Sequence, residues 1–444
     1  MLSKIFSLAV CGVGGRPIGV EVDLAGGLPS FTTVGLPDTA VRESKDRVLA
    51  AIRNSGFDFP LKKITVNLSP SELRKSGTQY DLAMALGILC ASGQLKADGR
   101  HESFCFLGEL ALDGRLQPVR GVLPMALAAK KAGFKALVVP RRNQGEARLA
   151  EVEVYGAQSL REAADFLEGK PGMQPAAPSD PALELEPVAA QAEDLSEVRG
   201  QPLAKRALEI AAAGGHNLLF IGPPGTGKSM LARRLPGVLP PLSASEALEV
   251  AQIHSVCGLL SRMDRALTLR PFRSPHHTVS TAALVGGGSL PRPGEVSLAH
   301  RGVLFLDELP EFHRDALEAL REPLEAASVT VSRAKDSEVF PADFMLVAAM
   351  NPCPCGYLGH PKKNCLCTPT QVHKYRSRVS GPLWDRIDLH VEVPPVSFED
   401  WSGNGRPAEE SSAPVRERVG AAHGIQGRRF TGTGIFLNAQ MGPK

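Results

Sequence analysis

The chain has 444 residues, of which 43% are hydrophobic and 22% charged, a balance typical of a soluble globular protein with two or three domains. Its formal net charge is only +3, which excludes a strongly basic field over the whole molecule, so contacts to nucleic acid would need local basic clusters. No run of about 18 apolar residues is present, which excludes a predicted membrane span. We expect a cytoplasmic protein without a membrane partner.

The first 168 residues alternate strand-like and helix-like segments. A short apolar run near the N-terminus passes directly into alternating apolar residues from Ile18 to Leu24, which favours a first strand over a signal peptide. Residues 1–168 are therefore expected to form a compact mixed α+β domain. The predicted strands lie at residues 19–24, 63–68, 104–107 and 136–139, and the predicted helices at 39–54, 80–90, 122–132 and 159–167.

A segment rich in proline and alanine follows at residues 169–193. It contains no aromatic residue, which predicts a semi-extended linker between two domains. Strands and helices alternate again over residues 194–396, which predicts an α/β domain with a parallel sheet. Residues 397–444 begin with a polar stretch and continue into a charged helix near residues 415–422.

A phosphate-binding loop is predicted between the strand ending at Ile221 and the helix beginning near Lys228, where the sequence fits GxxxxGK[ST]. Its glycines allow positive φ and close approach to phosphate oxygens, and the helix N-terminus adds its dipole. We expect Lys228 to reach the β- and γ-phosphates and Ser229 to bind Mg²⁺. A chance glycine turn is the alternative. The predicted nucleotide-binding residues are Gly222, Pro223, Pro224, Gly225, Thr226, Gly227, Lys228, Ser229 and Asp307.

Two later strands place polar side chains at their carboxyl ends. The first runs from Val303 into Asp307 and Glu308, which predicts a magnesium ligand and a general base that polarises the attacking water. An acidic pair that caps the next helix is the alternative. The second strand ends in Asn351, whose side chain could orient that water. An Asn-Pro turn is the alternative there.

Four of the eight cysteines form a tight cluster with the pattern C-x-C, nine residues, C-x-C. In a chain expected to be cytoplasmic, such clustering favours a metal over disulfides. The thiolates of Cys353, Cys355, Cys365 and Cys367 could close a tetrahedral structural zinc site. Because the one-residue spacing is tighter than in common zinc motifs, ordinary loop thiols remain the alternative interpretation.

Several long runs carry a family resemblance: HNLLFIGPPGTGKS, FRSPHHTVSTAALVGGG, RPGEVSLAHRGVLFLDELPEF, AAMNPCPCG and SGPLWDRIDLHVEVP. They resemble the magnesium-chelatase-like AAA+ ATPases, and within these the ComM (YifB) competence-associated family. The resemblance covers essentially the whole chain. It implies a P-loop AAA+ core that binds ATP and Mg²⁺ between the subunits of a homo-hexameric ring.

The resemblance also implies an arginine finger supplied by a neighbouring subunit. Arg386 matches the position used in related ring helicases, with Arg376 and Arg378 as alternatives, and a surface ion pair is the plain alternative for each.

The family is thought to act as a helicase in DNA branch migration during recombination and natural transformation, so single-stranded or branched DNA is the implied partner. The expected DNA contacts are Arg273, His276 and His277 near a triple glycine, and Arg333 and Lys335 in a hairpin-like segment. The two histidines could equally be structural.

Residues 1–168 resemble the proteolytic domain of Lon-type proteases, most closely from Gly108 through Ala128. Where the Lon lysine would fall this chain has Leu123, and the positions closest to the serine are Gln79, Tyr80 and Asp81. A leucine cannot activate a nucleophile. The domain is therefore expected to be non-catalytic and to serve assembly or partner binding.

Relatives continue into a helical lid with a second sensing arginine, whereas this chain stops at Lys444, so we expect residues 397–444 to be the start of a truncated lid. This puts ATP turnover in question. A second class of function is a chelatase- or chaperone-type ATPase that remodels a protein partner. The low charge and few aromatic residues mildly favour that alternative, and the family resemblance favours a DNA motor.

Overall fold

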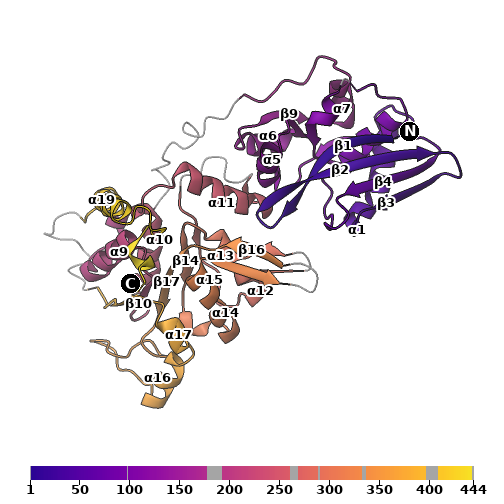
Figure 1. Ribbon diagram of the computed structural model, residues 1–444. Helices are drawn as coiled ribbons and strands as arrows, with labels where there is room; N and C mark the ends of the chain where they lie inside the picture. The colour runs from indigo at the N-terminus through magenta and orange to yellow at the C-terminus, as the bar shows by residue number, and fades with distance from the viewer. Residues whose placement is uncertain are drawn as a thin grey trace. The chain divides into compact units, whose positions relative to one another are not determined.

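The computed structural model describes residues 2–97, 99–177, 193–260, 269–288, 291–332, 337–396 and 409–442 (Figure 1). The chain forms two compact units, one of residues 1–184 with 251–264 and the other of residues 185–250 with 265–444. No helix in the described ranges combines the length and apolar character needed to span a bilayer.

The first unit is built on a mixed seven-stranded sheet with the order β3-β4-β2-β1-β5-β8-β9. Its strands are β1 (Leu2–Cys11), β2 (Gly14–Ala25), β3 (Ser30–Val34), β4 (Lys63–Ser69), β5 (Phe104–Phe106), β8 (Ala136–Pro140) and β9 (Glu153–Ala157), with a separate ribbon of β6 (Glu109–Leu110) and β7 (Leu116–Gln117). β1 and β2 pair as an antiparallel hairpin, which confirms the prediction that the N-terminus enters the first sheet.

The helices of this unit are α1 (Thr39–Arg42), α2 (Ser44–Asn54), α3 (Asp81–Ala91), α4 (Arg100–Ser103), α5 (Val122–Lys131), α6 (Gln144–Arg148) and α7 (Leu160–Leu167), with the 3₁₀ turn η1 (Arg141–Asn143). α3 is apolar on nearly every side and packs on β1 and β2 in the core. The single helix predicted at residues 39–54 is instead two, because the chain turns at Glu43.

The second unit is built on a five-stranded sheet with the order β11-β14-β17-β10-β18, and every pairing in it is parallel. The strands are β10 (Leu218–Ile221), β11 (Phe272–Arg273), β14 (Val303–Leu306), β17 (Met345–Met350) and β18 (Leu389–Glu392). The three central strands β14, β17 and β10 are short and wholly apolar, as expected for a parallel sheet covered on both faces. The predicted fold class is confirmed.

Helices and small ribbons complete the second unit. The helices are η2 (Leu195–Glu197), α9 (Pro202–Gly214), α10 (Lys228–Val238), α11 (Ala244–Val256, which continues into the first unit), α12 (Thr281–Val285), α13 (Glu295–Leu298), η4 (Leu309–Glu311), α14 (Arg314–Ala319), α15 (Arg321–Ala326), α16 (Pro369–Arg376), α17 (Gly381–Trp384), α19 (Ser412–Arg429) and η5 (Asn438–Gln440). Two antiparallel ribbons accompany them. One pairs β12 (Gly286–Gly287) with β13 (Arg292–Pro293), and the other pairs β15 (Ser328–Ser332) with β16 (Ser337–Pro341).

The charged helix predicted near residues 415–422 is longer and belongs to the core of the second unit. α19 packs against α9 and α10, with Val415 and Val419 buried among their apolar side chains. Gln426 donates hydrogen bonds to the carbonyls of Ala213 and Ala422. The apolar contacts explain why a helix with so polar a sequence has a fixed position.

Candidate functional site

The phosphate loop connects β10 to α10 at the carboxyl end of the sheet. β10 lies between β17 and β18, two strands from much later in the chain, so the loop leaves the sheet where the strand order reverses. Gly225 and Gly227 have φ of +79° and +89°, which side chains rarely tolerate. A Cβ added to Gly222 would lie 2.2 Å from the carbonyl oxygen of Val393. The backbone conformation therefore requires glycine at positions 225 and 227, and the close approach of Val393 requires it at position 222.

Lys228 lies within this loop and is largely buried. Its ammonium donates hydrogen bonds to the carbonyls of Gly222 at 2.6 Å and Pro223 at 2.8 Å, and to Asn351 Oδ1 at 3.3 Å. Burial lowers the pKa of Lys228, and the negative charges of Asp307 and Glu308 oppose that shift. The structure thus directs one positive charge to the place where the phosphate-loop motif requires it.

Ser229 and Asp307 come together from elements far apart in the sequence. The Ser229 hydroxyl donates to Asp307 Oδ2 at 2.7 Å, and the other carboxylate oxygen accepts the backbone N–H of Glu308 at 2.9 Å. A hydroxyl and a carboxylate are oxygen ligands of the kind that Mg²⁺ prefers. The donor set present fits that ion.

Asn351 lies at the same edge of the sheet. β17 pairs with β10 so that Met350 is opposite Ile221, and the two chains then leave the sheet together. This register explains the contact between Asn351 and Lys228, which lie 123 positions apart. The structure therefore brings together the polar residues that follow β10, β14 and β17.

Glu308 has an unusual backbone conformation and an unforeseen partner. Its φ of +53° is in the left-handed region, which costs a non-glycine residue free energy. His277 Nδ1 lies 3.3 Å from Glu308 Oε2, and its ring packs against His276 with centroids 4.1 Å apart. His276 in turn contacts the Thr278 hydroxyl at 2.9 Å. The sequence did not reveal the pairing of His277 with the predicted general base.

Gln201 is another residue that the sequence analysis missed. It has φ of +55° at the start of α9, and its side-chain amide donates to the carbonyls of Thr226 and Pro394 at 3.2 and 2.6 Å. It thereby ties the phosphate loop to the end of β18. In the sequence, the adjacent Gly200 and Pro202 indicate that a helix starts here, but they do not indicate the contact of Gln201 with the phosphate loop.

The three arginines considered as a finger do not share one environment. The backbone of Arg386 precedes β18 and so lies at the edge of the sheet opposite the phosphate loop. Its guanidinium donates to the carbonyl of Pro382 at 3.0 Å and pairs with Glu325. Arg378 pairs with Glu311 at 2.7 Å. Arg376 donates to the carbonyl of Pro352 at 3.3 Å.

The residues considered for DNA contact are only partly described. Arg273 makes a bidentate ion pair with Glu295, at 2.6 and 2.8 Å, so its charge already has a partner. β15 and β16 confirm the predicted hairpin, whereas Arg333 and Lys335, between them, lie outside the described residues.

The four clustered cysteines converge at the end of β17. Their sulfur atoms all lie within 4.8 Å of one another, and none forms a disulfide. Cys353 is buried, and Cys355, Cys365 and Cys367 are half-buried.

Comparison with known proteins gives matches over most of the chain. The model of the magnesium chelatase subunit ChlI matches residues 194–401, and a second model of the ChlI subunit of Mg-chelatase matches residues 20–143. YifB from Salmonella typhimurium is 48% identical over 433 residues, which cover 96% of this chain and 83% of that protein. The competence protein ComM from Haemophilus influenzae is 45% identical over 442 residues, covering 99% and 85%.

This chain belongs to the YifB/ComM family of magnesium-chelatase-like AAA+ proteins. The family accounts for ATP and Mg²⁺ as the ligands of the phosphate loop, which its donor groups fit. A third match, the Lon protease of Salinispora arenicola, is 28% identical over 167 residues, 36% of this chain and 21% of that protein. The Lon-like character predicted for part of this YifB/ComM-family chain is thus supported.

In the first unit, the positions that the sequence analysis compared with a Lon dyad are occupied by packing residues. Leu123 is fully buried, and its backbone N–H donates to Glu146 Oε1 at 3.0 Å. Burial raises the pKa of Glu146, while hydrogen bonds to Ser255 and to the backbone of Leu123 oppose that rise. These groups stabilise the start of α5, and no lysine is among them.

Gln79, Tyr80 and Asp81, the positions compared with the Lon serine, likewise make contacts that stabilise the fold of this unit. Tyr80 is fully buried, and the carboxylate of Asp81 forms a bidentate ion pair with Arg47 at 2.7 and 3.1 Å. The Gln79 amide donates to the carbonyl of Ser76 at 2.9 Å. None of the three offers a nucleophile with a nearby base.

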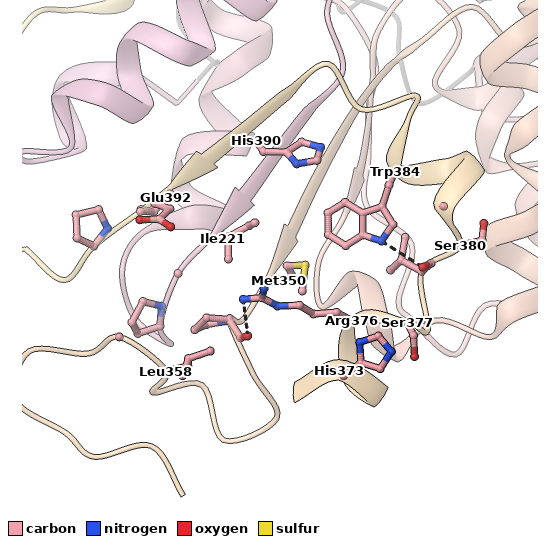
Figure 2. Close-up of a pocket in the computed structure, with 18 of the residues that line it drawn as sticks. Ile221, Met350, Leu358, His373, Arg376, Ser377, Ser380, Trp384, His390 and Glu392 are labelled. Atoms are coloured by element: carbon pink, nitrogen blue, oxygen red, sulfur yellow. Dashed lines mark hydrogen bonds between the residues drawn. The ribbon is translucent and has the colours of Figure 1, made fainter. Parts of the chain in front are cut away.

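A cavity of about 1140 Å³ lies beside the phosphate loop, at the carboxyl ends of β10, β17 and β18 (Figure 2). The loop contributes Gly222 and Pro223 to its wall, but Lys228, Ser229 and Asp307 are not part of it. Trp384 of α17 and Leu358 of the connection between β17 and α16 also line it. The cavity therefore borders the predicted chemistry without containing it.

Proposed function

We propose that this chain is an ATP-hydrolysing AAA+ motor that remodels DNA, acting as a homo-hexameric helicase or branch-migration factor in recombination and natural transformation. The observation that carries the proposal is the convergence of Lys228, the Ser229–Asp307 pair and Asn351 at one edge of the sheet. The name of the relative from Haemophilus influenzae, competence protein ComM, supports the biological part.

The chemistry follows from the positions of the side chains. Lys228 would exchange its loop carbonyls for β- and γ-phosphate oxygens, and Ser229 and Asp307 would hold Mg²⁺. Glu308 would take the proton of the attacking water as general base, and Asn351 would orient that water. Mg²⁺ neutralises charge on the phosphates when bound.

The hexamer supplies what one subunit lacks. The backbone of Arg386 lies at the edge of the sheet opposite its own phosphate loop, which suits a finger that reaches the site of the next subunit. Such an arginine would stabilise charge in the transition state. Its ion pair with Glu325 would have to open for this role.

The proposed domains are residues 1–168, a linker at 169–193, the AAA+ core at 194–396 and a C-terminal segment at 397–444. The first would be a non-catalytic domain for assembly or partner binding, in a protein of the cytoplasm. The linker is described only at its two ends, and residues 397–408 lie outside the described part of the segment. A structural Zn²⁺ at the four cysteines is the third proposed cofactor, beside ATP and Mg²⁺.

For the DNA contacts, Arg273, His276, His277, Arg333 and Lys335 remain the proposed residues. The test is ATP turnover and binding of single-stranded and branched DNA at several salt concentrations, with the double variant Arg333→Ala, Lys335→Ala. We expect DNA to stimulate turnover, and the variant to bind DNA more weakly with a smaller salt slope. Unchanged binding would contradict this contact assignment.

The second candidate is a chelatase- or chaperone-type ATPase that remodels a protein. The net charge of +3, with two tryptophans and four tyrosines, gives little capacity for base stacking and favours it. Robust turnover that no DNA changes would support this alternative over the DNA motor.

A further inference from the structure

The segment from Asn351 to Thr368 is a long connection without helix or strand that joins β17 to α16. Connections of this length are uncommon in compact domains and usually have a function. Apolar burial holds little of it beyond Pro352 and Cys353, since Leu366 is 87% exposed and Leu358 is 39% exposed. Something else must offset the entropy lost on ordering it.

The four cysteine sulfurs supply the geometry of a single metal ion. The Sγ atoms of Cys353, Cys355 and Cys365 lie 3.4, 3.6 and 3.6 Å from one another. A tetrahedral zinc ion with Zn–S bonds of about 2.3 Å places its sulfurs about 3.8 Å apart. A disulfide would need about 2.05 Å. The observed spacing fits the metal and not the covalent bond.

Backbone N–H groups surround these sulfurs as they surround thiolates. Leu358 N donates to Cys353 Sγ at 3.3 Å, and Cys355 N donates to Cys367 Sγ at 3.4 Å. Cys367 N donates to Cys365 Sγ, also at 3.4 Å. Such second contacts orient ligands and stabilise their negative charge.

The same segment forms a wall of the phosphate loop. Asn351, its first residue, contacts Lys228 at 3.3 Å. Gly356 packs so closely that an added Cβ would lie 2.8 Å from Pro224 Cδ. On its other side the segment is fixed to α16, where Arg376 donates to the carbonyl of Pro352 (Figure 2). The position of the segment is therefore coupled to the nucleotide site.

We propose that one zinc ion, bound by Cys353, Cys355, Cys365 and Cys367, holds this segment against the phosphate loop and so sets the affinity of the nucleotide site. The inference rests on the proposed function for that site, and adds a dependence of ATP binding on a metal that does not touch ATP. Without the ion, the segment loses its main restraint, and both Asn351 and the packing on Pro224 lose their fixed positions.

The first test measures zinc by elemental analysis and then the affinity for a fluorescent ATP analogue with Mg²⁺, without DNA. Wild type should carry one zinc per chain. The double variant Cys365→Ser, Cys367→Ser should carry none and bind the analogue about tenfold more weakly, the effect of one hydrogen bond to a charged group. Cys90→Ser, which changes a half-buried cysteine of the first unit, is the control and should match wild type.

Because the double variant could misfold, two glycine variants test the contact with the metal site intact. Gly356 and Gly359 both have positive φ, +83° and +77°, so alanine strains the backbone equally at either position. Only at Gly356 does the added Cβ meet the phosphate loop. Gly356→Ala should retain zinc and weaken the binding of the analogue several-fold, whereas Gly359→Ala should retain both.

The outcomes separate the two proposals. A chain that binds no zinc, or a zinc-free variant with unchanged nucleotide affinity, overturns the inference while leaving the ATPase intact. Equal behaviour of the two glycine variants overturns the contact with Pro224. Zinc-loaded wild type that binds no nucleotide overturns the proposed ATPase function, and with it the coupling. Oxidised, metal-free cysteines in the native chain overturn the metal site itself.

Discussion

The two units differ in the burial of the side chains at the positions considered for catalysis. In the first, the positions compared with a Lon dyad are Leu123 on the lysine side and Gln79, Tyr80 and Asp81 on the serine side, and all four are buried. In the second, Glu308 remains 56% exposed and Lys228 can still exchange its loop carbonyls for another oxygen ligand. At those positions the first unit has core side chains, whereas a Ser–Lys protease needs a nucleophile and a base there. Burial and partners, more than fold, distinguish a site from its remnant.

The strongest test of this contrast is Glu308→Gln. The amide keeps the size of the side chain but cannot accept a proton, so ATP turnover should fall by about 10²–10⁴-fold with nucleotide affinity unchanged. Steady-state hydrolysis and analogue binding measure the two effects. Glu318→Gln, which removes an exposed carboxylate paired with Arg321, is the control and should change neither. A fall of less than threefold would remove Glu308 from the general-base role.

In the first unit, Leu123→Lys should introduce the lysine expected at the Lon position without restoring a protease. Deprotonating a buried lysine at neutral pH costs about 4 kcal/mol, so urea denaturation should show a loss of about that size. Leu123→Met, which preserves volume and polarity, should cost less than about 1.5 kcal/mol. Peptidase activity in either variant, or full stability of the lysine variant, would contradict the packing role of Leu123.

The contact of His277 with Glu308 provides a finer comparison within the ATPase site. His277→Ala should lower kcat about tenfold, since an exposed carboxylate loses the partner that positions it. KM should stay the same. His276→Ala removes the neighbouring ring but no contact to Glu308, and should have a smaller effect. An equal effect of the two variants would favour the DNA-contact or structural interpretation of this loop.

The smallest effect concerns pH and a buried group of the second unit. Burial, with the nearby positive charge of Arg301, lowers the pKa of His300. As pH falls through about 6.5, the unfolded chain takes up this proton before the folded chain does, so stability present at higher pH is lost. The free energy of unfolding, measured by denaturant titration, should therefore drop by up to about 1 kcal/mol between pH 7.5 and pH 5.5. His300→Asn should flatten that dependence, and an unchanged slope would exclude His300 as its source.

Local patterns made much of this molecule predictable. The strand–loop–helix around Gly222–Ser229, and the strands ending before Asp307 and Asn351, were recognisable because hydrophobic runs and turn residues act over short distances. Since parallel strands share an edge, their polar ends could be expected to meet.

Contacts between distant residues could not be predicted in the same way. The pairing of His277 with Glu308, and the packing of Gly356 on Pro224, depend on how loops close over the sheet. The break at Glu43 was missed because the helical period continues through it. The cysteine spacing suggested a metal, but the distances between the sulfur atoms came only from the fold.

The central claim is that the second unit hydrolyses ATP through Lys228. The most direct measurement is steady-state ATP hydrolysis by the purified chain and by Lys228→Ala, each with and without single-stranded DNA. Lys374→Ala, a change at an exposed lysine of α16, is the matched control. The account predicts turnover by wild type and the control, stimulation by DNA, and a fall of at least about 10²-fold in Lys228→Ala. Equal turnover in Lys228→Ala and wild type would contradict it.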